Sequence, residues 1–126
     1  MNLPKINQSY QKLIVYQKSK LLVLEVYKIT KSFPSEEKFV LIPQMRRAAL
    51  SIPANIVEGY AKKSRKDFSR FLDISIGSAT ELGLFLEISL ELNYFSKSIF
   101  EKTNNLLTEV KKLLYSFQKS LRVTEV

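Results

Sequence analysis

Apolar residues recur at intervals of three and four along most of this chain, which predicts a series of amphipathic helices. The pattern breaks at Pro34, near residue 63 and at Asn93. The residue before a proline is pushed out of the helical conformation, so we expect the first helix to end beside Phe33. Between these breaks the chain is predicted to form helices over residues 13–32, 43–62, 65–92 and 97–121.

Short connections between successive helices favour antiparallel neighbours, so the predicted fold is all-α, an up-down-up-down four-helix bundle. Only 3 glycines and 4 prolines punctuate the chain, which is sparse for a β protein. We expect an N-terminal arm over residues 1–12, a bundle over residues 13–121 and a frayed C-terminus over residues 122–126.

Three positions carry local signals for helix ends. Ser64 followed by Asp67 fits a capping box at the start of the third predicted helix. Asn93 is a candidate stop for that helix, and Ser96 can cap the next one. These signals set the predicted bounds independently of the apolar pattern.

The segment PQMRRAALSIPANIVEGY, residues 43–60, is predicted to be the central helix of the bundle. Small residues fill its middle and allow a neighbouring backbone to approach closely. Its charged residues need partners, and a turn near residue 63 would bring Arg47 close to Glu81. We therefore predict an interhelical ion pair between these two residues.

The same turn would bring Glu58 close to Arg70, which predicts a second ion pair. Such pairs contribute specificity more reliably than stability. The alternative is that Arg46 and Arg47 grip a phosphate. We favour the ion pair for Arg47, whereas Arg46 stays open between the two interpretations.

The first and third predicted helices are apolar on more than one face. This pattern indicates helices that are central to their fold or shared with another subunit. Between residues 71 and 95 the third helix also carries four acidic residues and no Lys or Arg.

The composition excludes several kinds of site. The chain has neither cysteine nor histidine, so thiolate chemistry, histidine bases and histidine metal ligands are unavailable. A carboxylate magnesium site would need clustered acids, for which the candidates are Glu58, Asp73, Glu81 and Glu87. We therefore expect a protein that is not an enzyme and needs no cofactor. No apolar run suits a membrane span or a signal peptide, so a cytoplasmic protein without membrane contact is expected.

The net charge of +8 is concentrated in the first part of the chain. Residues 1–70 hold fourteen Lys or Arg and five Asp or Glu, a net charge of +9. The densest basic cluster consists of Lys62, Lys63, Arg65, Lys66 and Arg70. These cations at a helix start are typical of a phosphate-contacting surface. The alternative is a solvated loop.

Other residues near or beyond this cluster extend the hypothesis of nucleic-acid binding. Arg46, Lys18 and Lys20 are candidates for the same basic surface. Tyr60 and Phe68 flank the cluster and either stack on unpaired bases or pack in the core.

The segments VYQKS, VYKITKSFP, QMRRAALSIPANIVEGYAKKS and FSRFLDISIGSATELGLFLEIS resemble the 23S rRNA-intervening-sequence proteins, which are small bacterial four-helix bundles. The resemblance covers about residues 10–120, with Tyr16 standing where the family often has tryptophan. It implies a homopentamer and a likeness to the accessory proteins of diversity-generating retroelements. Those basic pentameric bundles bind nucleic acid and a reverse transcriptase. The family has no established catalytic residues to carry over.

Two hypotheses of function follow. The first is a non-enzymatic, oligomeric bundle that binds RNA or other nucleic acid through its basic surface. The second is a protein–protein scaffold or accessory subunit, for example for a reverse transcriptase, that does not bind nucleic acid directly.

Overall fold

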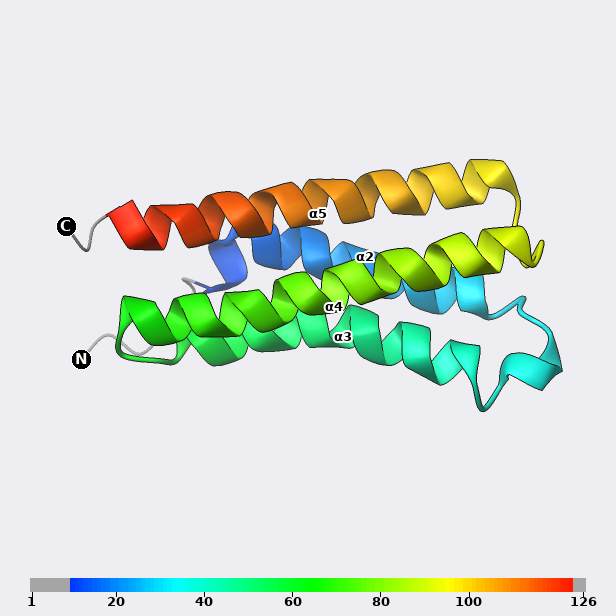
Figure 1. Cartoon of the computed structure of the whole chain (residues 1–126), viewed down its shortest axis with the longest axis horizontal. Helices are drawn as coiled ribbons and strands as arrows, with labels where there is room; N and C mark the ends of the chain where they lie inside the picture. Colours follow the sequence, from blue (N-terminus) through cyan, green and yellow to red (C-terminus); the bar gives the residue numbers. More distant parts are fainter. Residues whose placement is uncertain (1–9, 124–126) are drawn as a thin grey trace.

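The computed structural model describes residues 10–123, which are helical apart from the connecting segments. Its elements are α2 (Ile14–Thr30), the 3-10 turn η1 (Ser35–Glu37), α3 (Leu41–Tyr60), α4 (Arg65–Glu91) and α5 (Lys97–Val123). No strand occurs within residues 10–123. The long helices lie side by side, and α2 and α4 run in the direction opposite to α3 and α5 (Figure 1). The prediction of an all-helical bundle is confirmed.

The observed bounds differ from the predicted ones mainly at helix ends. Helix α3 begins at Leu41, so Pro43 lies in its first turn, where a missing N–H costs little. Helix α5 extends to Val123, two residues beyond its predicted end at residue 121, so Arg122 belongs to a helix. Residues 10–12 form a helical turn, and the rest of the predicted arm, residues 1–9, lies outside the described residues, as do residues 124–126.

Helix α4 is bounded by the residues that the sequence indicates. The N–H of Asp67 donates to the hydroxyl of Ser64 at 3.1 Å. At the other end Asn93 has a φ of 62°, and the N–H of Tyr94 donates to the carbonyl of Ser89 at 3.0 Å. This is the hydrogen-bond pattern of a Schellman C-cap. Ser96 then caps α5 by accepting from the N–H of Ile99 at 3.1 Å.

The core lies at the centre of a ring of helix contacts. Helix α2 packs against α3 and α5, and α4 packs against the same two helices. The apolar face of each helix is buried there, with Leu22, Ile52, Leu82 and Leu114 fully or almost fully enclosed. No helix in the described part of the chain is both long enough and apolar enough to cross a bilayer.

Helices α3 and α4 make the most extensive contact between elements of the described bundle, as the small residues of α3 predict. The hydroxyl of Ser75 donates to the carbonyl of Ile52 at 2.8 Å. A Cβ atom at Gly59 would lie 2.7 Å from the ring of Phe68 and 2.9 Å from the Cβ of Phe71. Backbone and side chains of the two helices are therefore in contact along their length.

One polar contact ties the η1 turn to the connection between α4 and α5. The hydroxyl of Tyr94 donates to Oε2 of Glu37 at 2.6 Å, while the N–H of Leu41 donates to Oε1 of the same carboxylate at 3.3 Å. The hydrogen bond to Glu37, with burial and the nearby negative charges, raises the pKa of Tyr94 to about 12. Glu37 thus links the start of α3 to the far end of α4.

The two predicted ion pairs are not present in the described residues. Arg47 and Glu81 are both exposed, and no ion pair joins them within residues 10–123. Glu58 pairs instead with Lys62 in its own helix at 3.7 Å. The polar contacts between α3 and α4 are made instead by short side chains, with the hydroxyl of Ser75 on the carbonyl of Ile52 and the hydroxyl of Ser78 on that of Ser51.

Candidate nucleic-acid interface

The predicted basic cluster lies at one end of the bundle, where α3 connects to α4 (Figure 1). Lys63, Arg65 and Lys66 are exposed there. Within residues 10–123 no side-chain hydrogen bond or ion pair engages these three cations. They are therefore available to a phosphate without first breaking an internal contact.

The other cations of the cluster, Lys62 and Arg70, share the ring of Phe71. The Nζ of Lys62 lies 5.1 Å from the ring centroid, and the guanidinium of Arg70 lies 5.2 Å from it. Each cation also pairs with an acidic residue close by in the sequence. Lys62 pairs with Glu58 at 3.7 Å, and Arg70 pairs with Asp67 at 3.4 Å. Exposed pairs of this kind contribute little to stability, so a phosphate can replace the carboxylate at small cost.

A groove beside this cluster runs between the start of α4 and the end of α5. Its volume is about 590 Å³, and its basic lining residues are Arg65, Lys66, Arg70 and Arg122. Asp73 lies in the same groove and accepts a hydrogen bond from the side-chain amide of Gln118 at 2.6 Å. We call Lys62, Lys63, Arg65, Lys66, Arg70 and Arg122 the basic end.

Sequence reasoning missed Arg122 and Phe71 as parts of this surface. Arg122 lies in the last turn of α5, and the direction of the helices brings that turn to the start of α4. An antiparallel bundle predicts this proximity, so the topology was the available signal. Phe71 follows Arg70 directly in the sequence, but nothing local indicates that two cations share its ring.

The start of α4 adds to the positive potential of the basic end. Backbone N–H groups at a helix N-terminus are oriented toward any anion placed there, and the helix dipole has the same sign. In this chain Arg65 and Lys66 occupy the first positions of α4, just after Ser64. Side-chain charge and backbone dipole therefore act on the same region.

Tyr60 and Phe68 are half-buried and pack against other aromatic rings, and Phe68 also packs against the core, which favours the packing interpretation of these residues. Their rings lie 6.0 Å apart in an edge-to-face arrangement. Phe68 also contacts Phe117 at 5.2 Å, and Tyr60 contacts Tyr10 at 6.2 Å. The rings are engaged with one another, so the groups that this end presents to solvent are its exposed cations.

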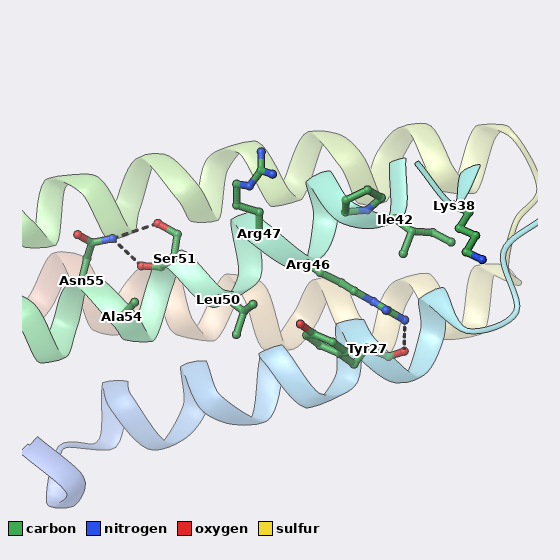
Figure 2. Close-up of a pocket in the computed structure, with 10 residues that line it drawn as sticks. Tyr27, Lys38, Ile42, Arg46, Arg47, Leu50, Ser51, Ala54 and Asn55 are labelled. Atoms are coloured by element: carbon green, nitrogen blue, oxygen red, sulfur yellow. Dashed lines mark hydrogen bonds between the residues drawn. The ribbon is translucent and has the colours of Figure 1, made fainter. Parts of the chain in front are cut away.

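Arg46 is held by α2 and does not extend the basic end. Its Nε donates to the hydroxyl of Thr30 at 3.0 Å, and a terminal nitrogen donates to the carbonyl of Tyr27 at 3.4 Å. The guanidinium also lies 4.5 Å from the centroid of the Tyr27 ring (Figure 2). The neighbouring Arg47 points away from this contact and is exposed (Figure 2).

The remaining candidates, Lys18 and Lys20, lie on α2. Lys18 pairs with Glu109 of α5 at 3.2 Å. Lys20 is exposed beside Tyr16 and Leu21. Neither lysine lines the groove of the basic end, so the structure separates them from the cluster around residues 62–70.

The acidic candidates for a magnesium site do not converge. Glu58, Asp73, Glu81 and Glu87 are all exposed. Within residues 10–123 no group of three or more acidic side chains is placed to hold a metal ion.

The family of the chain follows from its sequence and fold. Residues 11–116 match the family described as 23S rRNA-intervening sequence protein. The chain belongs to this family. The resemblance found in the sequence is thus confirmed over most of the length it covers.

A solved structure supports this assignment. A crystal structure from Bacteroides thetaiotaomicron, described as a protein with unknown function from the S23 ribosomal protein family, has a TM-score of 0.78 to this chain. The two are 34% identical, and the match covers 84% of this chain and 99% of the other. No match was found among curated proteins.

Proposed function

We propose that this member of the 23S rRNA-intervening sequence family is a non-enzymatic, oligomeric bundle that binds RNA or other nucleic acid through its basic end. The observation that carries the proposal is a set of exposed cations, Lys63, Arg65 and Lys66, that have no partner within residues 10–123 and lie at the N-terminus of α4. Phosphate contacts made by such residues release counterions, so binding is sequence-tolerant and weakens as salt rises.

The proposed unit is the antiparallel four-helix bundle, and the proposed assembly is a homopentamer. The resemblance to pentameric family relatives and the exposed apolar side chains of α2 and α4 support assembly. Several basic ends held in one particle raise the avidity for a long polyanion without any new contact. Each end therefore needs only modest affinity of its own.

The test neutralises the three unpaired cations together, as Lys63→Gln, Arg65→Gln and Lys66→Gln. We expect the affinity for a labelled single-stranded RNA at low salt to fall by about tenfold or more, because phosphate contacts are lost. Fluorescence anisotropy measures this affinity. The helical content and oligomeric state should not change, since all three side chains are exposed.

The matched control removes the same charge elsewhere. Lys28, Lys31 and Lys97 are exposed and lie toward the opposite end of the bundle. Their replacement by glutamine should change RNA affinity much less than the first triple variant does. Equal losses in the two variants would show that net charge, and not the basic end, determines binding.

A second candidate function is a scaffold for a protein partner such as a reverse transcriptase. Exposed apolar side chains on the outer surface favour it, among them Leu24, Ile74 and Leu84. Contact through apolar surface survives high salt, whereas phosphate contact does not. Retention of a purified reverse transcriptase at high salt, without RNA binding at low salt, would favour the scaffold.

A further inference from the structure

A groove on the outside of the bundle runs between α2 and α3. Its volume is about 640 Å³, and apolar side chains of Tyr27, Ile42, Leu50 and Ala54 line it. Figure 2 shows Leu50 and Ala54 on the side of α3 that faces α2. The groove therefore offers an apolar, concave surface to an external group.

Fixed polar groups border this groove and make it positive. Arg46 is clamped against Tyr27 in its wall, while Arg47 and Lys38 lie at its edge and are exposed. Within the described residues Arg47 has no hydrogen-bond or ion-pair partner. An occupant of this groove should be apolar along its centre and acidic where it meets Arg47.

Helix α4 has an outer stripe with the complementary character. Ile74, Leu84 and Ile88 are 45%, 53% and 39% exposed and are spaced to lie on one face of the helix. Glu81 lies on the same face between them, and beyond Arg70 the helix carries only acidic charges. A Cβ atom at Gly77 would meet nothing within 4 Å, so the middle of the stripe is open.

We infer that the α4 stripe of one copy of this chain docks in the α2–α3 groove of the next copy. The stripe is apolar and carries Glu81, whereas the groove is apolar with Arg47 and Lys38 at its edge, and Glu81 would meet Arg47 across the contact. Opposite charges that face one another fix the register and partner of an interface. The inference rests on the proposed oligomer and names the surfaces that form it.

The contact is heterologous, because each copy uses its groove to contact one neighbour and its stripe to contact the other. Such contacts close into rings when the rotation between copies permits. The groove is lined by residues of α2, α3 and the segment between them, and the stripe lies on α4, so the two surfaces share no residue.

Charge reversal tests the predicted pairing. We expect Arg47→Glu alone and Glu81→Arg alone each to weaken self-association by about tenfold or more, because like charges then face each other. The double variant, Arg47→Glu with Glu81→Arg, should recover most of the loss. Sedimentation velocity over a dilution series measures the association, and circular dichroism checks that each variant is folded.

Apolar substitutions provide a second, independent arm. Leu84→Ser with Ile88→Ser should reduce association by a similar factor, because the centre of the contact is lost. The control Tyr115→Ser removes a side chain that is 53% exposed on α5, outside both surfaces, and should leave association unchanged.

The outcomes separate this inference from the proposed function. If the wild type assembles but neither charge reversal changes its association, the inferred interface is wrong. The same holds if the double variant stays dissociated. Neither result contradicts the proposed RNA binding. A wild type that is monomeric at all concentrations overturns the interface and the oligomer together. RNA affinity lost in the Arg47→Glu variant without any change in association would show that the groove binds nucleic acid instead.

Discussion

Arg46 extends from α3 to α2, where its guanidinium makes three contacts. It donates to the hydroxyl of Thr30 and the carbonyl of Tyr27, and it stacks on the Tyr27 ring. The planar fork of arginine can make these contacts at once, whereas lysine cannot. Arg46 therefore fixes the position of α2 against α3.

Replacing Arg46 with alanine should lower the free energy of unfolding by about 2 kcal/mol, because hydrogen bonds from a charged donor and a cation–π contact are lost. Urea unfolding at one fixed protein concentration measures the change. Arg65→Ala is the matched control, since that arginine is exposed and unpaired within residues 10–123. Equal losses in both variants would contradict the structural role of Arg46.

Gly59 and Gly77 predict opposite responses to alanine. A Cβ atom at Gly59 would meet Phe68 and Phe71 at 2.7 and 2.9 Å, so Gly59→Ala should cost about 1–3 kcal/mol through overpacking. Gly77 has open space, so Gly77→Ala should gain about 0.5–1 kcal/mol from helix propensity. Chemical unfolding compares the two, and a stabilised Gly59→Ala variant would be inconsistent with the close α3–α4 contact.

Single-residue environments were the hardest feature to predict from the sequence. The sequence favours an ion pair for Arg47 and leaves Arg46 open, whereas the structure pairs Arg46 and exposes Arg47. The two residues differ by only one step around the helix, so their environments depend on the rotation of α3 relative to α2. That rotation is set by packing of the whole core and has no local sequence signal.

At the scale of elements, local chemistry determines where the helices begin and end. Ser64, Asn93 and Ser96 are identifiable from the sequence because caps involve residues only a few positions apart. The pairing of Glu37 with Tyr94 could not be predicted in this way, because it joins segments that are distant in the sequence. Arg122 differs from this pair, because the antiparallel order of the helices by itself brings the end of α5 to the start of α4.

The contact between Tyr94 and Glu37 should make stability sensitive to alkaline pH. The pKa of Tyr94 is raised from 10.0 to about 12 in the fold, so the folded chain favours the neutral phenol. The stabilisation is therefore present below about pH 10 and is lost as the pH rises through about 12. Thermal unfolding across this range should show a steeper loss in the wild type than in Tyr94→Phe.

Lysines also titrate at alkaline pH, so the difference between the two proteins is the informative quantity. Ultraviolet difference absorption follows the phenols directly, and the wild type should show one late-ionising phenol that is missing from the variant. Identical pH profiles for both proteins would show that the hydrogen bond to Glu37 does not contribute.

At the scale of the whole molecule, charge is separated along and around the bundle. The basic end gathers cations from the α3–α4 connection and the end of α5, whereas beyond Arg70 helix α4 carries only acidic charges. The sequence predicts this separation, since residues 1–70 have a net charge of +9. In the proposed function one of these surfaces attracts polyanions, and in the inferred interface the other contacts a neighbouring copy.

The salt dependence of RNA affinity tests the central claim most directly. A plot of log affinity against log salt concentration gives the number of phosphate contacts, at about 0.7 per contact for single strands. We expect the variant lacking the charges of Lys63, Arg65 and Lys66 to have a slope shallower than the wild type by about 2, with the Lys28, Lys31 and Lys97 control close to the wild type. Wild-type binding that is absent at low salt, or a slope unchanged by loss of these three charges, would contradict the account.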